Sequence, residues 1–444
     1  MTFSDDTLRA LSDRIRPVAD RLAQEFPGDA PRRQPIHTVY GGAQLFRADG
    51  ARKLGDLALR ALETYAPDAA TLATAIELPG GATLHETVYR RVVEKLHREP
   101  VEDFRLDFED GYGNRPDDEE DGHACSAAAE VAAGLDAGTL PPFVGIRIKP
   151  LSGELHRRAL RTLDVFVSEL VERAGRLPTN FVVTLPKVQH PEQVAVLSDA
   201  LAALEDGLSI DAGTLVAELM VETPQSIIGH DGRAGIRPLV DAGGGRVVAA
   251  HFGTYDYTAS CQITASHQSM THPACDFARH VQQVSLAGTG VWMCDGATNV
   301  MPVAVHRGGD LTAEQQDENR RSVHAAWRLH VAHIRHSLVH AYYQGWDLHP
   351  AQLPTRYAAV YWFFLEGLDP AATRLRTFVD QAARATLVGE VFDDAATGQG
   401  LLNYFIRALN CGAVSEAEVV ERTGLTVDEL RTRSFLRILE GRRA

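Results

Sequence analysis

Cysteine is scarce in this sequence, and its cysteines are not arranged in pairs. Five cysteines occur among 444 residues, widely spaced and without a Cys-x-x-Cys pair. An odd number at such spacing argues against a disulfide framework and against a cysteine zinc site, and it is typical of a protein from a reducing compartment. The five are Cys125, Cys261, Cys275, Cys294 and Cys411.

The chain also lacks long apolar runs and a surplus of basic residues. No stretch of about 18 uncharged apolar residues is present, so nothing predicts a membrane-spanning helix. The opening MTFSDDTLRALSDRIRP has no basic segment followed by an apolar one, so no signal peptide is expected. With 44 Lys and Arg against 59 Asp and Glu, the net charge is −15, which argues against nucleic acid as a partner. We therefore expect a cytoplasmic protein that binds a small molecule.

What the chain does have is a regular alternation of strand-like and helix-like segments, which predicts βαβ units and a parallel sheet. Eight strands favour an α/β fold of the (β/α)₈ TIM barrel type. The alternative is an open doubly wound sheet, but that fold usually carries a longer glycine-rich turn than the GG at 41–42. The strand segments are HTVYGG (37–42), FRLDFED (104–110), FVGIRIKP (143–150), FVVTLPKV (181–188), LVAELMVETP (215–224), RVVAAHFG (246–253), GVWMCDG (290–296) and WDLHP (346–350).

The same pattern divides the chain into three regions. Residues 1–36 are expected to be an N-terminal helical segment, and residues 37–355 a TIM barrel with a helical insertion at 66–103. Residues 356–444 are expected to form a C-terminal helical domain that could act as a lid. The composition, 45% hydrophobic and 23% charged, suits a globular protein with a large core.

Charged residues alternate with apolar ones along three of the expected strands. In FRLDFED, the apolar set can pack on helices, which leaves Arg105, Asp107 and Glu109 facing the barrel interior. The same parity places inward Arg147 and Lys149 on the next strand, and Glu218 and Glu222 on the strand at 215–224. Buried charges are costly unless they are paired or bind a metal.

Six charged residues of the chain fall at the carboxyl ends of strands, which meet at one mouth of a barrel. Oxygen ligands without His or Cys suit a hard cation such as Mg²⁺, and we favour a metal site there. The alternative is a network of structural ion pairs, such as Arg105 with Glu218. The six residues are Asp107, Glu109, Arg147, Lys187, Glu222 and Asp256.

Taken in order, these segments resemble the superfamily of HpcH/HpaI aldolases, citrate lyase β subunits and malyl-CoA lyases, with malate-synthase-like features. The resemblance rests on LDFEDGYG, GIRIKP, TLPKV, ELMVETP, HFGTYDYTAS and GWDLHPAQL, and it spans residues 37–355. It implies a Mg²⁺-dependent barrel, alternatively one using Mn²⁺, with Glu222 and Asp256 as metal ligands. It also implies that Arg147 is catalytic and binds substrate. Lys187 is expected either to bind substrate or to pair with the mouth carboxylates.

A further segment, VFDDAATGQ at 391–399, resembles the malate synthase segment that carries the catalytic aspartate, here Asp394. The alternative is a helix that begins with two acidic residues, where the helix dipole favours them. The chain departs from malate synthases in having no Trp shortly after Arg147. It departs from the HpcH/HpaI aldolases in having Asp110 where they carry a His.

The resemblance implies a carbon–carbon lyase of the aldol or Claisen type that acts on a 2-oxo acid or 3-hydroxy acid, with or without a CoA thioester. In that reaction Asp107 and Glu109 would orient groups around the metal, and Asp394 would exchange a proton with the partner fragment. CoA phosphates could be held by Arg47, Arg52 and Lys53, which a solvated helix start explains equally well. The alternatives are a malate-synthase-like condensing enzyme and a non-catalytic or complex-dependent subunit. We also expect a homo-oligomer, and we expect His251, His267, His272 and His280 to be structural.

Overall fold

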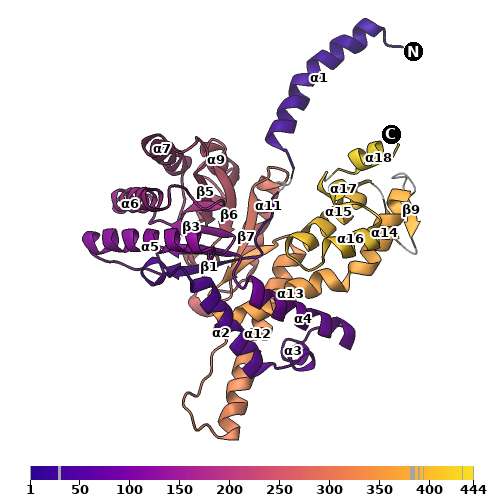
Figure 1. Cartoon of the computed structure of the whole chain (residues 1–444). Helices are drawn as coiled ribbons and strands as arrows, with labels where there is room; N and C mark the ends of the chain where they lie inside the picture. The colour runs from indigo at the N-terminus through magenta and orange to yellow at the C-terminus, as the bar shows by residue number, and fades with distance from the viewer. Residues whose placement is uncertain are drawn as a thin grey trace.

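The structure, a computed structural model, describes residues 2–28, 32–380, 386–388, 391–393, 395–432 and 434–443. Its centre is a closed barrel of eight parallel strands in sequence order, β1 to β8 (Figure 1). The predicted (β/α)₈ fold is therefore confirmed, and all eight expected strands are present. They are β1 (His37–Gly42), β2 (Asp103–Asp107), β3 (Phe143–Arg147), β4 (Phe181–Leu185), β5 (Val216–Val221), β6 (Val247–Phe252), β7 (Trp292–Ala297) and β8 (Gln344–Asp347).

Helices connect the strands and surround the barrel. They are α2 (Gly50–Tyr65), α5 (Asp117–Ala137), α6 (His156–Ala174), α7 (Pro191–Leu208), α8 (Pro224–Ile227), α9 (Ile236–Ala242), α10 (Thr254–Ser260), α11 (Pro273–Leu286) and α12 (Ala313–Val339). The segment between β1 and β2 also holds α3 (Ala69–Ala75) and α4 (Ala82–Arg98). None of the helices in the described part of the chain is long and apolar enough to cross a membrane.

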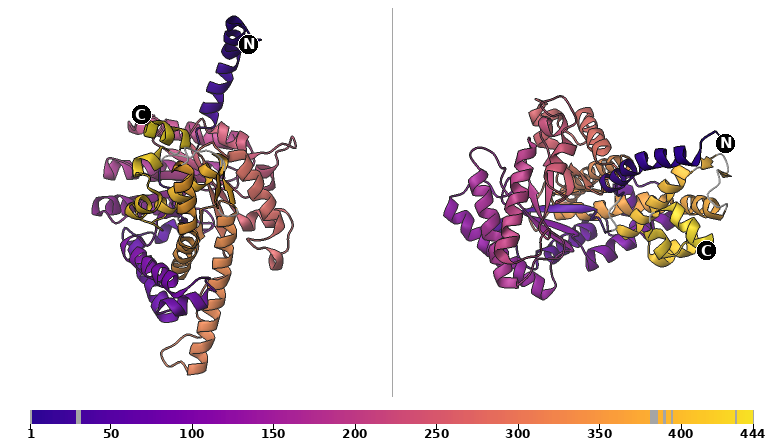
Figure 2. Two further views of the ribbon diagram at one scale, coloured as in Figure 1. Left: turned by 90° about the vertical axis from the view of Figure 1, so that its right-hand side faces the viewer. Right: turned by 90° about the horizontal axis from the view of Figure 1, so that it is seen from above.

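The C-terminal region packs beside the barrel, against the insertion between β1 and β2 (Figures 1 and 2). Arg91 of α4 pairs with Glu418 at 2.5 Å across this contact. The region was expected to be helical throughout, but it also contains a small antiparallel hairpin. Its elements are α13 (Leu353–Glu366), α14 (Leu368–Asp380), β9 (Thr386–Val388), β10 (Val391–Asp393), α15 (Ala395–Asn410), α16 (Glu416–Thr423), α17 (Val427–Arg431) and α18 (Phe435–Arg443).

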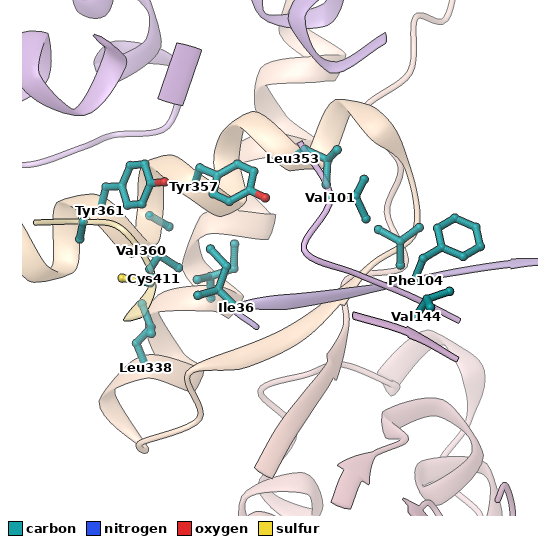
Figure 3. Packing of buried hydrophobic residues seen from close by; sticks show 14 of the residues in the cluster. Ile36, Val101, Phe104, Val144, Leu338, Leu353, Tyr357, Val360, Tyr361 and Cys411 are labelled. Carbon is teal, nitrogen blue, oxygen red and sulfur yellow. The ribbon is translucent and has the colours of Figure 1, made fainter. Parts of the chain in front are cut away.

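One continuous hydrophobic core joins the barrel to this region. Figure 3 shows Ile36 and Val101, beside the first two strands, next to Tyr357 and Val360 of α13. Cys411, which follows α15, belongs to the same cluster. All five cysteines are free, as the sequence indicated. Because α13 is buried on almost every side, the C-terminal helices are anchored to the barrel through a shared core.

Helix α1 (Asp5–Glu25) differs from every other long helix in the described residues, because none of its residues is buried. It projects away from the barrel in Figure 1 and in the left view of Figure 2. Its apolar side chains nevertheless form a stripe, which is exposed to solvent in the single chain. They are Leu8, Leu11, Ile15, Val18 and Leu22.

The parity predicted for the strands is confirmed in the barrel interior. Arg105 points inward, as expected, and it pairs with Asp103 and, at 2.8 Å, with Glu218 of β5, the ion pair considered as an alternative to a metal site. His251 of β6 lies 2.8 Å from the same Glu218 carboxylate. Parity fails at Lys149, because β3 ends at Arg147 and the chain then turns. The Lys149 ammonium instead binds Glu120 of α5 at 2.6 Å, outside the barrel.

Asp347, the last residue of β8, stabilises the contact between β8 and β1, the two strands that close the barrel. It is fully buried and accepts hydrogen bonds from His37 Nδ1 on β1 at 2.7 Å, His330 Nε2 on α12 at 3.0 Å and Arg356 Nη2 on α13 at 2.9 Å. Although burial alone would raise it, Arg356 and the two histidines hold the pKa of Asp347 well below its usual range. One carboxylate thus connects both closing strands to two helices.

We predict that Asp347→Ala lowers the free energy of unfolding by about 3–5 kcal/mol, because it leaves the buried Arg356 without its partner. Urea unfolding followed by circular dichroism measures this loss. The control is Asp199→Ala, an exposed position on α7, which should change stability by no more than about 0.5 kcal/mol. Equal effects in the two variants would show that Asp347 does not hold the closure.

Candidate active site

The charged residues predicted at the mouth lie at the carboxyl ends of five consecutive strands. Asp107 ends β2 and Arg147 ends β3, and these two side chains are in direct contact. The other four follow strands β2, β4, β5 and β6 by a few residues, and ion pairs or hydrogen bonds connect them to one another. They are Glu109, Lys187, Glu222 and Asp256.

Arg147 is held rigidly by carboxylates. Its Nε donates to Asp107 Oδ1 at 2.7 Å and its Nη2 donates to Asp107 Oδ2, a two-point contact that fixes the plane of the guanidinium. Its Nη1 lies 3.3 Å from Glu109 Oε2. The guanidinium also stacks on the ring of Tyr40, 4.9 Å from the ring centroid. The side chain is only 6% exposed, so a positive charge is held ready in a nearly dry site.

Asp107 has its acceptor capacity used by the protein itself. Besides Arg147, its carboxylate accepts from the backbone N–H of Glu109 at 2.9 Å and of Gly111 at 2.6 Å. A Cβ at position 111 would lie 2.7 Å from Asp107 Oδ2, so the turn after β2 needs a glycine there. Asp107 therefore positions Arg147 and the turn, and it has little capacity left to exchange a proton.

Lys187 stands among the remaining mouth carboxylates. Its ammonium pairs with Glu109 and lies 3.4 Å from Asp110 Oδ1 and 3.5 Å from Asp256 Oδ2. Burial opposes its charge, but the Glu222 and Glu109 carboxylates raise the pKa of Lys187 above its usual value. Its backbone has φ of 52°, a left-handed conformation that is rare for a lysine and aims its N–H at Glu222. Of the two roles considered for Lys187, the ion pair is present in the structure.

Glu222 is as deeply buried as Asp107 at the mouth. It is 1% exposed, and its Oε1 accepts from the Lys187 N–H at 2.7 Å. Burial raises the pKa of Glu222 to about 8, and the negative charge of Asp256 adds to the effect, although Lys187 opposes it. A Cβ on residue 253 would lie 2.4 Å from Glu222 Oε2, so Gly253 makes room for the carboxylate. The protein's own cations therefore do not fully neutralise this group.

The donor set fits a hard divalent cation. Asp256 lies in the first turn of α10, and its carboxylate is 43% exposed, so it faces the solvent side of the mouth while Glu222 forms the floor. Mg²⁺ commonly takes one or two protein carboxylates and fills its other positions with water or substrate oxygens. Within the described residues, no three His, Cys, Asp or Glu ligand atoms converge at this mouth.

A pocket of about 400 Å³ opens beside the mouth, between β1, β8 and the start of α2. Tyr40, whose ring stacks on Arg147, is among its lining residues, but Arg147 itself does not line it. Arg47 and Lys53 line it, whereas Arg52 does not. The rest of the lining is largely apolar, including Leu45, Phe46, Leu54, Leu348 and Leu353.

Two residues of the site were not singled out from the sequence. Tyr40 could have been found by its inward parity in HTVYGG, but the ring stacking on Arg147 needs the three-dimensional structure. Asp110 is part of the FRLDFED segment, yet its contacts with Lys187 depend on a turn beyond β2. Asp394 lies outside the described residues. His267 and His272 make local hydrogen bonds to Thr264 and to the N–H of Ala274, which are structural contacts.

Comparison with solved structures places this architecture among known barrels. A citrate lyase from Burkholderia xenovorans LB400 superposes with a TM-score of 0.52 at 18% identity, over 77% of this chain and 93% of that one. A malate synthase from Haloferax volcanii, crystallised with glyoxylate, matches at 13% identity with a TM-score of 0.46, over 90% of this chain and 96% of that one. At such identities the likeness concerns the fold alone.

No curated protein matches the chain. One family model does match, and it covers residues 15–438, which is nearly the whole sequence. The chain therefore belongs to the family described as a domain of unknown function, DUF6986.

Proposed function

We propose that this protein is a Mg²⁺-dependent carbon–carbon lyase that acts on a 3-hydroxy acid and yields a 2-oxo acid. The proposal rests on the presence of a fixed cation and a buried acid at the same mouth of the barrel. Arg147 is a fixed, buried cation held by Asp107, and Glu222 is a buried acid that lacks sufficient positive charge. Such a mouth suits a substrate that brings anionic oxygens together with a divalent cation.

In this proposal Glu222 and Asp256 hold the cation, which when bound supplies Lewis acidity to the substrate oxygen. Arg147 binds the substrate carboxylate and stabilises negative charge as it develops. Lys187, released from Asp256, becomes a second partner for substrate oxygens. Burial raises the pKa of Glu109, although Arg147 and Lys187 oppose this, and a raised pKa suits a carboxylate that accepts the substrate hydroxyl proton.

Cleavage then follows aldol chemistry. The hydroxyl proton leaves to Glu109, the oxygen forms the new carbonyl, and the bond between the carbinol carbon and its neighbour breaks. Its electron pair passes to the neighbouring carbon as an enolate, which takes up a proton. Asp394 is assigned to that proton transfer from its sequence context. Condensation is the same path reversed, so formation of the carbon–carbon bond uses the same residues.

The apolar pocket beside the mouth supports an acyl-CoA thioester as the second fragment. Its lining could pack against a pantetheine chain, and Arg47 and Lys53 offer charge to phosphates. Lys53 at present pairs with Asp49 at 2.9 Å and is exposed, so it is free to exchange this partner for a phosphate.

The expected homo-oligomer is proposed to form through α1. The apolar residues at 8, 11, 15, 18 and 22 repeat with alternating spacings of three and four, the pattern of a two-stranded coiled coil. A helix of 21 residues without a buried side chain gains no stabilisation by packing on its own chain. We therefore propose α1 of a second copy as its partner.

Isothermal titration calorimetry can test whether the mouth binds a metal and a 2-oxo acid together. Wild type should bind glyoxylate, pyruvate or oxaloacetate only when Mg²⁺ is present, because the cation joins the acid to Glu222 and Asp256. Asp256→Ala should weaken this binding on the order of 100-fold. Asp136→Ala, an exposed change on α5, should not. If neither Mg²⁺ nor any of the three acids binds wild type, the lyase proposal is wrong and a complex-dependent subunit is favoured.

The thioester pocket predicts a charge effect on one substrate only. Arg47→Glu combined with Lys53→Glu should raise KM for an acyl-CoA roughly 10-fold or more, since both charges that could meet phosphates are reversed. Binding of the 2-oxo acid should stay as in wild type. Arg52→Glu is the matched control, because Arg52 is a neighbouring base that does not line the pocket. An equal rise in KM in all variants would show that the pocket does not bind the acyl-CoA.

The α1 pairing predicts a change in mass measured by light scattering after size exclusion. Leu11→Glu with Ile15→Glu should halve the mass of the assembly, because it charges the centre of the stripe. Asp13→Asn with Asp20→Asn, on the opposite face of the helix, should leave it unchanged. A wild-type mass of 48.4 kDa, that of one chain, would contradict the pairing.

A further inference from the structure

A second cluster of metal-binding side chains lies away from the mouth, between α11 and α12. Asp276 and His280 are four residues apart on α11, and His336 and His340 are four residues apart at the end of α12. Residues with this spacing lie on one face of a helix, so each helix presents a pair of ligands. The ligand atoms of Asp276, His336 and His340 all lie within 4.8 Å of one another.

The side chains of the cluster already lie close to one another. His336 Nε2 lies 2.8 Å from Asp276 Oδ1, and the rings of His336 and His340 are 4.4 Å apart. Ligands around a tetrahedral zinc are roughly 3.3 Å apart, given bonds of about 2.0 Å. Separations of up to 4.8 Å between the three atoms must shorten to about 3.3 Å, so side-chain rotations that move an atom by about 1.5 Å or less would place them around one ion.

The backbone already orients one of the imidazoles. His340 Nδ1 lies 2.8 Å from the carbonyl oxygen of His336, which can only accept, so Nδ1 carries the proton and Nε2 keeps its lone pair. Metal-binding histidines are commonly held in this way, by a carbonyl that takes the N–H of the other ring nitrogen. Asp276 is oriented similarly, because Arg279 Nη2 lies 3.5 Å from its Oδ1.

We propose that Asp276, His336 and His340 form a second metal site, specific for a borderline transition-metal cation of the Zn²⁺ type. The ring centroids of His280 and His340 are 5.4 Å apart, so we assign the fourth position around the ion to His280 or to water. Two imidazoles and one carboxylate suit Zn²⁺ and Co²⁺, whereas Mg²⁺ prefers oxygen ligands alone. All three ligands are half-buried, so an ion can reach the site from solvent.

Such an ion would connect two parts of the chain that carry the mouth. Helix α11 follows the segment with Asp256, and α12 leads into β8 and Asp347. Near the cluster, Tyr342, which lies just beyond the end of α12, already contacts α11, because its hydroxyl donates to the carbonyl of Arg279 at 2.8 Å. The role of the site is therefore to clamp α11 to the end of α12, which stabilises the barrel without taking part in the reaction.

Titration of the metal-free full-length protein with Co²⁺, followed by its visible absorption, tests the proposal. Wild type should bind one equivalent with the intense bands of tetrahedral coordination, and the same band should appear in Glu222→Gln, where the mouth site is removed. His336→Ala with His340→Ala should lose the band and bind Zn²⁺ at least about 100-fold more weakly, since loss of a supporting contact alone costs about 10–100-fold.

His97→Ala, an exposed histidine on α4, is the control and should leave the band unchanged. Zn²⁺ should also raise the thermal midpoint of wild type and of Glu222→Gln, but not that of the His336 and His340 variant, whose fold is checked by circular dichroism. His340→Gln, a milder change, should show the same loss of the band. An unchanged band in both variants, or no tetrahedral band in wild type, would overturn the proposal.

Discussion

Charge can be buried inside a closed barrel only where each group finds a partner, and two arginines supply that compensation in successive layers. Arg105 neutralises Asp103 and Glu218 in the middle of the barrel. One layer higher, Arg147 binds Asp107 at the mouth. Since breaking one buried pair leaves a charge without compensation, the two layers restrict which side chains the neighbouring strands can carry.

The positive charges at the mouth do not fully compensate the negative charges of its carboxylates. These carboxylates are therefore the groups that can bind a metal or exchange a proton. Burial raises the pKa of Glu222 to about 8, and Lys187, which also pairs with Glu109, opposes this only in part. Groups with strongly shifted pKa values in a cleft are typical of functional sites. Binding a divalent cation would relieve the repulsion between Glu222 and Asp256, and it would release Lys187 from its present ion pairs. The Glu222 carboxyl group, which lacks a full positive partner, and the fixed guanidinium of Arg147 thus complement each other.

Periodicity predicted the barrel and much of its interior, because inward and outward residues alternate along a strand. It succeeded for Arg105 and Glu218, which lie within strands, and failed for Lys149, which lies just beyond the end of one. The hairpin of β9 and β10 was not predicted, because strands of three residues leave too short a pattern. The roles of the mouth residues were inferred from resemblance, and Asp394 lies in a segment outside the described residues. The pairing of His336 with Asp276 joins positions 60 residues apart, which spacing along the sequence does not reveal.

Electron paramagnetic resonance with Mn²⁺ in place of Mg²⁺ can test whether Glu222 and Asp256 hold a divalent cation at the mouth. The titration is best made in the His336→Ala and His340→Ala background, so that only the mouth can contribute. We expect one bound Mn²⁺ per chain, which is lost in Glu222→Gln and whose spectrum changes when a 2-oxo acid is added. Undiminished Mn²⁺ binding in Glu222→Gln, or a spectrum that no 2-oxo acid alters, would contradict it.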